Sequence, residues 1–292
     1  MRILITGGNG QLGRALQTVL AGDDVVALGH GELDITDAGA VKRALAEARP
    51  EVVVHSAAWT DTAGCEKDPE RALLVNGRGA GIVAGACRAA GAAMVYVSSN
   101  EVFDGEKGAP YDEDDATNAI NAYAASKLEG ERRVREALEP RYIVRTSWLY
   151  GPGRVSFPEK IIQAAKSQGK LRAVTDEIAS PTWTVDLAEA IGKLVRQPAY
   201  GVFHFSNAGW CSRMEWAVEI LRLAGMSDVP VAPATMAEFD LPYRKPVFTA
   251  IANNNGARLG IRLRPWQEAL ADHLLGGSRA AATGTRRARR GR

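Results

Sequence analysis

The chain has 292 residues, 46% hydrophobic and 24% charged, and its 36 Lys and Arg against 34 Asp and Glu give a formal net charge of +2. This composition is typical of globular proteins and excludes collagen-like, coiled-coil and wholly disordered chains. No run of 18 uncharged apolar residues occurs, and a strand-like segment follows Met1 at once, so we expect no membrane partner, no secretory signal and a cytoplasmic location. Three scattered cysteines, Cys65, Cys87 and Cys211, are too few for a disulfide framework or a zinc site, and we predict no metal.

The charge is unevenly distributed along the chain. Residues 276–292 hold six arginines and no acid, so subtracting those six from +2 leaves −4 for residues 1–275. The Gly/Ala/Thr-rich composition of 276–292 predicts a disordered, solvated basic tail. Binding to an acidic surface or a nucleic acid is the alternative interpretation of this tail, and we expect no nucleic-acid partner.

The first half of the chain alternates strand-like and helix-like patterns, which predicts an α/β protein with a Rossmann-type, doubly wound parallel sheet. The strand-like runs lack inside/outside alternation, as expected for strands buried on both faces. In chain order we predict strand 2–6, helix 11–20, strand 25–28, a helix capped by Asp37 and stopped by Pro50, strand 52–55, helix 69–90, strand 94–97, a helix through Tyr123 to about residue 138, and strand 142–145.

After Gly151 the rhythm changes, and a second lobe is expected. We predict helices 157–168, 185–196 and 215–224, the last opened by a capping box of Ser212 and Glu215, with a late strand over 202–205. The expected division is a dinucleotide-binding domain over 1–150, rejoined by about 183–205, and a smaller, mainly helical substrate lobe over 151–182 and 206–275.

A glycine-rich turn joins the first strand to the first helix. Gly7, Gly10 and Gly13 are spaced GxxGxxG, and Gln11 and Leu12 open the helix. Glycine is needed here because the backbone must turn tightly and approach a pyrophosphate with no Cβ in the way, while the helix N-terminus supplies free N–H donors. In this strand-to-helix context the pattern predicts dinucleotide binding.

The second strand ends without the acid that would bind a ribose 2′-hydroxyl. His30 stands in that turn, and no acid occurs before Glu32. Arg14 directly follows the glycine pattern, where it would face a 2′-phosphate or lie exposed on the helix. We therefore expect NADP(H) as the preferred cofactor, with NAD(H) also usable.

Three side chains suit the reduction of a ketone. Tyr123 and Lys127 are spaced i, i+4 on one helix face, so the ammonium is expected to lower the pKa of the phenol from about 10 and assist proton transfer. Ser99 ends the fourth strand, at the sheet edge where ligands bind, and would hydrogen-bond the substrate carbonyl.

Nine segments in order resemble the short-chain dehydrogenase/reductases of the extended, nucleotide-sugar branch, and within it the dTDP-4-dehydrorhamnose reductase family. The resemblance covers the chain to about Leu275. The segments are ILITGGNGQLG, ELDITD, HSAAWTDTAGCEKDPERALLVN, VSSNEVFDG, NAYAASKLEGE, RTSWLYG, DEIASPTWTVDLA, RKPVFTAI and LGIRLRPWQEAL.

The resemblance implies NADPH-dependent reduction of the C4 ketone of a dTDP-4-keto-6-deoxyhexose. It places catalysis on Ser99, Tyr123 and Lys127, with Tyr123 and Lys127 also touching cofactor, and it suggests Arg264 as a diphosphate partner. Further implied contacts are Asp34, Ile35, Ala57 and Ala58 for the cofactor, and Thr60, Thr62, Asn100, Glu101 and Trp148 for the substrate.

One segment departs from the family pattern. Where the family commonly has Ser-Thr-Asp-Tyr-Val-Phe, this chain has Ser98-Ser99-Asn100-Glu101-Val102-Phe103. Ser99 keeps the hydroxyl, whereas Asn100 removes a charge and Glu101 adds one. The departure leaves the identity of the sugar open more than the type of reaction.

Two other functions remain open at this stage: a nucleotide-sugar epimerase or dehydratase that retains NAD, and a non-catalytic, NADP-binding regulatory subunit. A homodimer is also left open. His55 and His204 lie in apolar strand-like runs, which favours core histidines over metal ligands.

Overall fold

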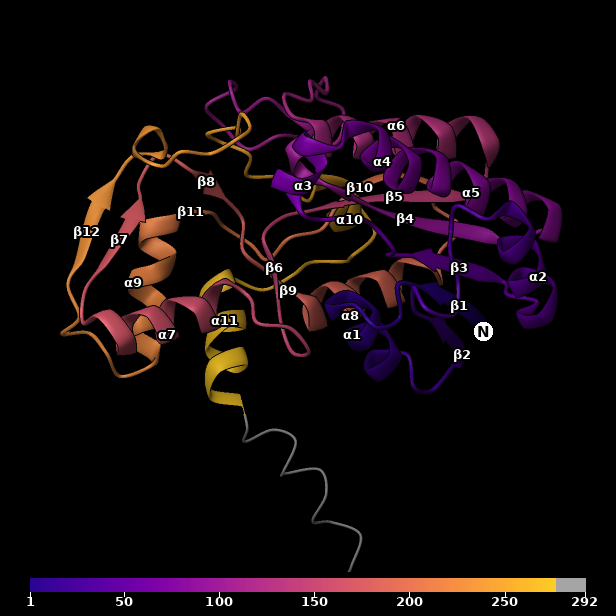
Figure 1. The fold of residues 1–292 in the computed structure, drawn as a ribbon. Helices are drawn as coiled ribbons and strands as arrows, with labels where there is room; N and C mark the ends of the chain where they lie inside the picture. The colour runs from indigo at the N-terminus through magenta and orange to yellow at the C-terminus, as the bar shows by residue number, and fades with distance from the viewer. Residues whose placement is uncertain (277–292) are drawn as a thin grey trace, which may run out of the picture.

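The computed structural model describes residues 1–276, so the basic tail predicted from Gly276 onward lies, apart from that glycine, outside the described residues. Its centre is a six-stranded sheet in the order β10-β5-β4-β3-β1-β2, with all neighbours parallel (Figure 1). The predicted doubly wound α/β class is confirmed. The strands are β1 (Arg2–Thr6), β2 (Asp24–Leu28), β3 (Val52–His55), β4 (Ala93–Ser99), β5 (Arg141–Thr146) and β10 (Gly201–His204).

Helices cover both faces of the sheet. On one face α1 (Gln11–Val19) and α8 (Thr184–Leu194) pack on Ile3 and Ile5 of β1, and on the other the cluster around Leu4 includes residues of α2 (Ala38–Ala48), α5 (Gly79–Ala90) and α6 (Ala122–Ala137). Successive strand residues therefore enter opposite cores, which is why the strands show no polar alternation.

The predicted helix over 69–90 is interrupted. It consists of α4 (Pro69–Ala72), a π-helical turn η1 (Leu73–Arg78) and α5, and a short helix α3 (Thr62–Lys67) precedes it. Single π turns inside helices occur frequently at functional sites. The two predicted N-terminal caps are present: Asp37 accepts hydrogen bonds from backbone N–H groups of α2, and Ser212 and Glu215 form the capping box of α9 (Arg213–Leu223).

The second lobe contains more strand than predicted. Beside α7 (Phe157–Gln168), α9 and α11 (Trp266–Leu275), it holds a parallel pair formed by β7 (Leu171–Val174) and β12 (Val231–Ala234). Its core is aromatic, with Trp216 buried among its neighbours. The remaining short elements are η2 (Asn100–Val102), β6 (Leu149–Tyr150), β8 (Ile178–Ala179), β9 (Thr182–Trp183), β11 (Cys211–Ser212), η3 (Met236–Glu238) and α10 (Asn254–Arg258).

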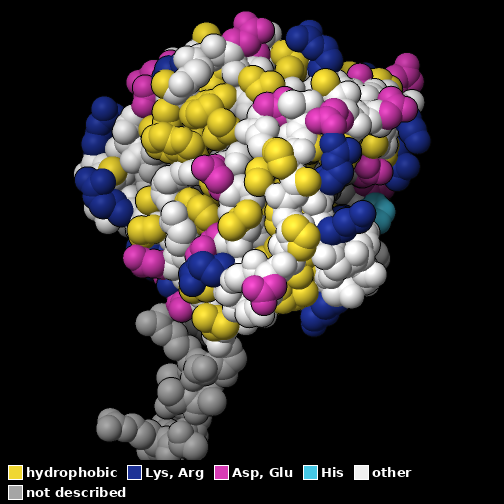
Figure 2. All heavy atoms as spheres, turned by 90° about the vertical axis from the view of Figure 1, so that its left-hand side faces the viewer, with side chains coloured by type: hydrophobic (Ala, Val, Ile, Leu, Met, Phe, Trp, Pro, Cys, Tyr) yellow, Lys and Arg dark blue, Asp and Glu magenta, His cyan; other side chains and the backbone are white. Residues whose placement is uncertain are grey.

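The chain passes from this lobe back to the sheet through α8 and β10, so residues 184–204 pack with the first half (Figure 1). The domain boundaries themselves stay a prediction. On the face seen from the β7–β12 end, charged side chains of both signs are interspersed with hydrophobic groups (Figure 2). No helix within residues 1–276 has both the length and the apolar character needed to cross a bilayer.

Candidate active site

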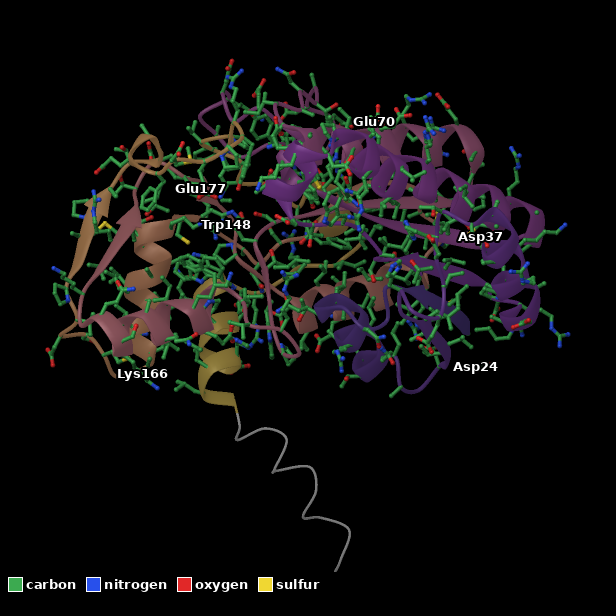
Figure 3. The ribbon with its side chains drawn as sticks, in the orientation of Figure 1. Asp24, Asp37, Glu70, Trp148, Lys166 and Glu177 are labelled. Atoms are coloured by element: carbon green, nitrogen blue, oxygen red, sulfur yellow. The ribbon has the colours of Figure 1, made fainter. Side chains whose placement is uncertain are left out.

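A cleft of about 670 Å³ opens at the carboxyl ends of β1 and β4, beside the point where strand order reverses between β1 and β3. Trp148 lies where the second lobe meets the sheet, with Glu177 close by (Figure 3). Fourteen of the predicted site residues line this cleft: Gly7, Gly10, Gln11, Leu12, Gly13, Ala58, Thr60, Thr62, Ser99, Asn100, Glu101, Tyr123, Lys127 and Trp148.

The glycine turn has no room for side chains. Gly7 has a φ of +76°, and a Cβ there would lie 2.7 Å from the backbone nitrogen of Ala57. A Cβ on Gly13 would lie 2.3 Å from the carbonyl oxygen of Gly7. Helix α1 begins after Gly10 with no side-chain cap and no acid in its first turn, so its N–H groups are open to an anion. These residues fit the pyrophosphate of a dinucleotide.

Three other residues predicted to contact the cofactor lie around this turn but outside the cleft lining. Ala57 packs against Gly7. Arg14 is exposed, and its Nε donates to the carbonyl oxygen of Asn9 at 3.1 Å. His30 is exposed beyond the end of β2. Their roles stay predictions.

The two residues expected near adenine follow β2. Oδ1 of Asp34 accepts hydrogen bonds from the backbone N–H and the hydroxyl of Thr36, at 2.9 and 2.7 Å, and these bonds lower the pKa of Asp34. Ile35 is buried against Gly79. Their contact with a cofactor stays a prediction.

The catalytic candidates meet in the cleft. Ser99 lies beside the Tyr123 hydroxyl, close enough to lower its pKa. Lys127 is 3% exposed, its Nζ donates to the carbonyl oxygen of Val97 at 2.7 Å, and it lies 4.3 Å from the centre of the Tyr96 ring. A phenol, a hydroxyl and an amine thus line one cleft with the glycine turn.

The pKa values of Tyr123 and Lys127 differ from those expected from the sequence. Burial, and next the charge of Glu101, raise the pKa of Tyr123 well above its usual value, and the hydrogen bond with Ser99 only partly offsets them. Burial lowers the pKa of Lys127 to about 7, against an opposing effect of Glu131. The prediction that Lys127 lowers the pKa of Tyr123 is therefore wrong here, because desolvation favours the neutral form of both groups.

The two residues that depart from the family pattern have separate contacts. Asn100 is buried and donates from Nδ2 to Oγ1 of Thr249 at 2.7 Å, which ties η2 to the loop before α10. The backbone N–H of Glu101 donates to Oγ of Ser99 at 3.2 Å, and its carboxylate accepts from Nδ2 of Asn121 at 3.1 Å. Burial raises the pKa of Glu101.

Trp148 has a strained backbone. Its φ of +39° lies in the left-handed region, which a bulky residue rarely adopts. The guanidinium carbon of Arg213 lies 3.5 Å from the centre of its ring, and Trp216 stacks on it at 5.4 Å between centroids. The second lobe therefore holds this side chain rigidly at the cleft wall.

Sequence reasoning missed Asn76, in the π turn η1. Asn76 is 1% exposed; its Oδ1 accepts from the Trp59 N–H at 2.7 Å, and its Nδ2 donates to the Trp59 carbonyl at 3.0 Å and to Oγ of Ser126 at 2.9 Å. It joins the loop after β3 to the helix that carries Tyr123. The available signal was that Asn76 ends ALLVN, part of one of the nine segments that carry the family resemblance.

Two further residues missed by the sequence analysis line the cleft after β5. The hydroxyls of Thr146 and Ser147 are buried without a hydrogen-bond partner among the described residues. Buried polar groups are normally paired, so unpaired hydroxyls in a cleft are candidates for ligand contacts.

Arg264, suggested as a diphosphate partner, does not line the cleft, and that role stays a prediction. Its guanidinium is bound by Asp186 at 2.9 and 3.0 Å and by Asp272 at 2.6 Å, in a hollow separate from the cleft. His55 and His204 are buried in the core, as expected. Within residues 1–276, no group of three or more His, Cys, Asp or Glu side chains is placed to hold a metal ion.

The comparisons with known proteins agree with this geometry. The family model described as RmlD substrate binding domain matches residues 1–276. The dTDP-4-dehydrorhamnose reductase of Streptomyces griseus is 40% identical over 281 residues, 93% of this chain and 92% of that protein. The dTDP-4-keto-6-deoxy-D-glucose reductase of Streptomyces niveus is 37% identical over 273 residues, 92% of this chain and 95% of that protein.

A solved structure matches equally closely. The crystal structure of a Bacillus anthracis dTDP-4-dehydrorhamnose reductase in complex with NADP superposes with a TM-score of 0.91 at 36% identity, covering 94% of this chain and 99% of that one. With a family model spanning the described residues and relatives matched over nearly their whole length, the chain belongs to the RmlD substrate binding domain family.

Proposed function

We propose that this protein is an NADPH-dependent reductase that converts the C4 ketone of a dTDP-4-keto-6-deoxyhexose, dTDP-4-dehydrorhamnose or a close relative, into the 4-hydroxy sugar. The observation that carries this proposal is that Tyr123, Ser99 and Lys127 line the same cleft as the glycine turn. The names of the matched reductases support the class of substrate.

Each catalytic candidate has a role that follows from its environment. NADPH, when bound, supplies the hydride for the ketone carbon. Tyr123 donates its hydroxyl proton to the ketone oxygen, and its raised pKa keeps that proton in place until the oxygen becomes strongly basic. Ser99 orients the same oxygen by a hydrogen bond. Lys127, fixed by the carbonyl of Val97, positions the cofactor ribose and supplies a cation beside the site when protonated.

NADP(H) is the preferred cofactor in this proposal. The NADP complex of the Bacillus anthracis relative supports it, as does the absence of an acid directly after β2. Arg14 and His30 are the candidate partners of the 2′-phosphate. Asp34, Ile35, Ala57 and Ala58 are the candidate contacts of the adenosine half and the groove.

In this proposal the sugar nucleotide binds between α3 and Trp148. Thr60 and Thr62 line the cleft near α3, and Trp148 lines it where the second lobe meets the sheet. Cys65, Cys87 and Cys211 are all free thiols, which supports a reducing, cytoplasmic compartment.

The experiment is a turnover assay on purified protein with NADPH and a panel of dTDP-4-keto-6-deoxy sugars, followed by loss of the NADPH absorbance band. We expect turnover, and we expect Tyr123→Phe to lower kcat by roughly 10²- to 10⁴-fold, the usual contribution of a positioned acid. A cofactor-loaded wild-type protein without turnover on the panel contradicts the proposal. Tightly bound NAD that survives purification and supports epimerisation or dehydration instead would favour the alternative function.

A further inference from the structure

Glu101 occupies a position where the resembled family commonly has tyrosine, and the proposed reaction gives it no role. It follows Ser99 closely in η2, and its backbone N–H donates to Oγ of Ser99 at 3.2 Å. Its side chain lines the cleft. The carboxylate is therefore held at a fixed place beside the hydroxyl that would orient the substrate ketone.

One oxygen of this carboxylate is anchored, and the other is available. Oε2 accepts from Nδ2 of Asn121, and Oδ1 of Asn121 in turn caps α6 by accepting from the N–H of Ala124 at 2.8 Å. Glu101 is thereby tied to the helix that carries Tyr123. Among residues 1–276, no N–H or O–H group donates to Oε1 of Glu101.

The nearby cations do not neutralise Glu101 by direct contact. Nζ of Lys245 and Nη2 of Arg213 both pair with Oε1 of Glu177, at 2.7 and 2.9 Å. An ionised carboxylate accepts hydrogen bonds but donates none. Oε1 of Glu101 is therefore suited to a ligand group that donates a hydrogen bond.

The ring of a 4-keto-6-deoxyhexose offers two neighbours of the reacting carbon. C3 carries a hydroxyl, which donates hydrogen bonds, whereas C5 carries a methyl group, which would cover the partly buried carboxylate and leave it unpaired. With the C4 oxygen held by Tyr123 and Ser99, the side of the ring nearest Glu101 is favoured to be the C3 side, because pairing a desolvated carboxylate stabilises the complex.

We propose that Glu101 is a specificity-determining residue that accepts a hydrogen bond from the C3 hydroxyl of the sugar, next to the reacting ketone. This inference rests on the proposed function. A site built to bind a hydroxyl rejects the analogue that lacks it, since the protein acceptor is then left buried and unpaired.

The test compares two sugars and two enzymes. kcat/KM is measured with NADPH for dTDP-4-keto-6-deoxyglucose and for its 3-deoxy analogue, with wild-type protein and Glu101→Met. We expect wild type to prefer the 3-hydroxy sugar by roughly 10- to 100-fold, the range for hydrogen bonds to charged groups. Glu101→Met is expected to reduce this preference to less than about 3-fold, mainly by losing activity on the 3-hydroxy sugar.

Two further variants make the result interpretable. Glu106→Gln changes an exposed carboxylate of the following loop and should keep the wild-type preference. Glu101→Gln keeps the shape and one acceptor oxygen, so it should give an intermediate preference even where the methionine variant folds poorly.

An equal loss on both sugars in the Glu101 variants, or no preference in the wild type, overturns the inference while leaving the reductase activity established. A wild-type protein that reduces neither sugar overturns the proposed function, and this inference with it.

Discussion

Lys127 is expected to destabilise the folded protein in the absence of ligands. It is 3% exposed, no carboxylate within residues 1–276 forms an ion pair with it, and burial lowers its pKa from 10.5 to about 7. Below pH 7 the lysine is charged in both the folded and the unfolded protein. Burial of that charge then destabilises the folded protein. At 1.36 kcal/mol per pH unit, the difference between the two pKa values corresponds to roughly 5 kcal/mol.

Replacing Lys127 by Met removes this charge and keeps most of the volume. The variant loses one hydrogen bond, to the carbonyl of Val97, which costs about 1 kcal/mol. We expect Lys127→Met to abolish turnover yet to exceed wild type in free energy of unfolding at pH 6 by about 4 kcal/mol, the burial penalty less the lost hydrogen bond. Because the unfolded chain binds the extra proton between pH 7 and 10.5, the penalty fades as pH rises, and the gain should approach zero near pH 9.5.

Urea denaturation of the cofactor-free protein at pH 6, 7.5 and 9.5 measures this directly. The difference between wild type and variant is the informative quantity, since the other titrating groups then cancel. Lys166→Met, on the exposed side of α7, is the matched control and should give the same difference at every pH. A wild-type-minus-Lys127→Met difference that does not change with pH would refute the reasoning.

Three further expectations concern the framework of the cleft. Gly13→Ala places a Cβ 2.3 Å from a backbone carbonyl oxygen. We therefore expect cofactor affinity, measured by fluorescence titration, to fall at least tenfold. Unchanged affinity would contradict the role given to the tight turn. Arg145→Met leaves Glu131 buried without its bidentate partner at 2.8 and 2.9 Å, and denaturation should show a loss of about 3–5 kcal/mol that an added Glu131→Leu change recovers in part. Asn76→Leu removes both hydrogen bonds to Trp59, so we expect the free energy of unfolding to fall by about 2 kcal/mol and KM to rise. A loss of stability with unchanged KM would show that Asn76 has no positioning role.

The sheet and the glycine turn could be predicted from the sequence because both depend on local rules. Apolar runs alternating with helical patterns require a parallel sheet, and Gly7 and Gly13 stand where any Cβ would collide with backbone. The i, i+4 spacing of Tyr123 and Lys127 likewise places them on one helix face without knowledge of the fold.

The contacts and pKa values that the sequence did not reveal depend on residues distant in sequence. Arg264 was suggested as a diphosphate partner, but Asp186, 78 residues away, forms a bidentate pair with it. The pKa values of Tyr123 and Lys127 depend on desolvation by the whole fold, which spacing does not reveal. Asn76 lies in the π turn of a segment predicted as one continuous helix, and its partner Trp59 belongs to the loop after β3.

Several energetically unfavourable groups lie at the cleft. The left-handed backbone of Trp148, the unpaired hydroxyls of Thr146 and Ser147 and the buried amine of Lys127 all face one cleft. Directly beneath it, the carboxylate of Glu131 is fully paired, by Arg145 and by the hydroxyl of Ser98 at 2.7 Å. The hydroxyls of Thr146 and Ser147 are the two, among nine buried unpaired polar atoms in the described residues, that line this cleft, where a bound ligand can pair with them.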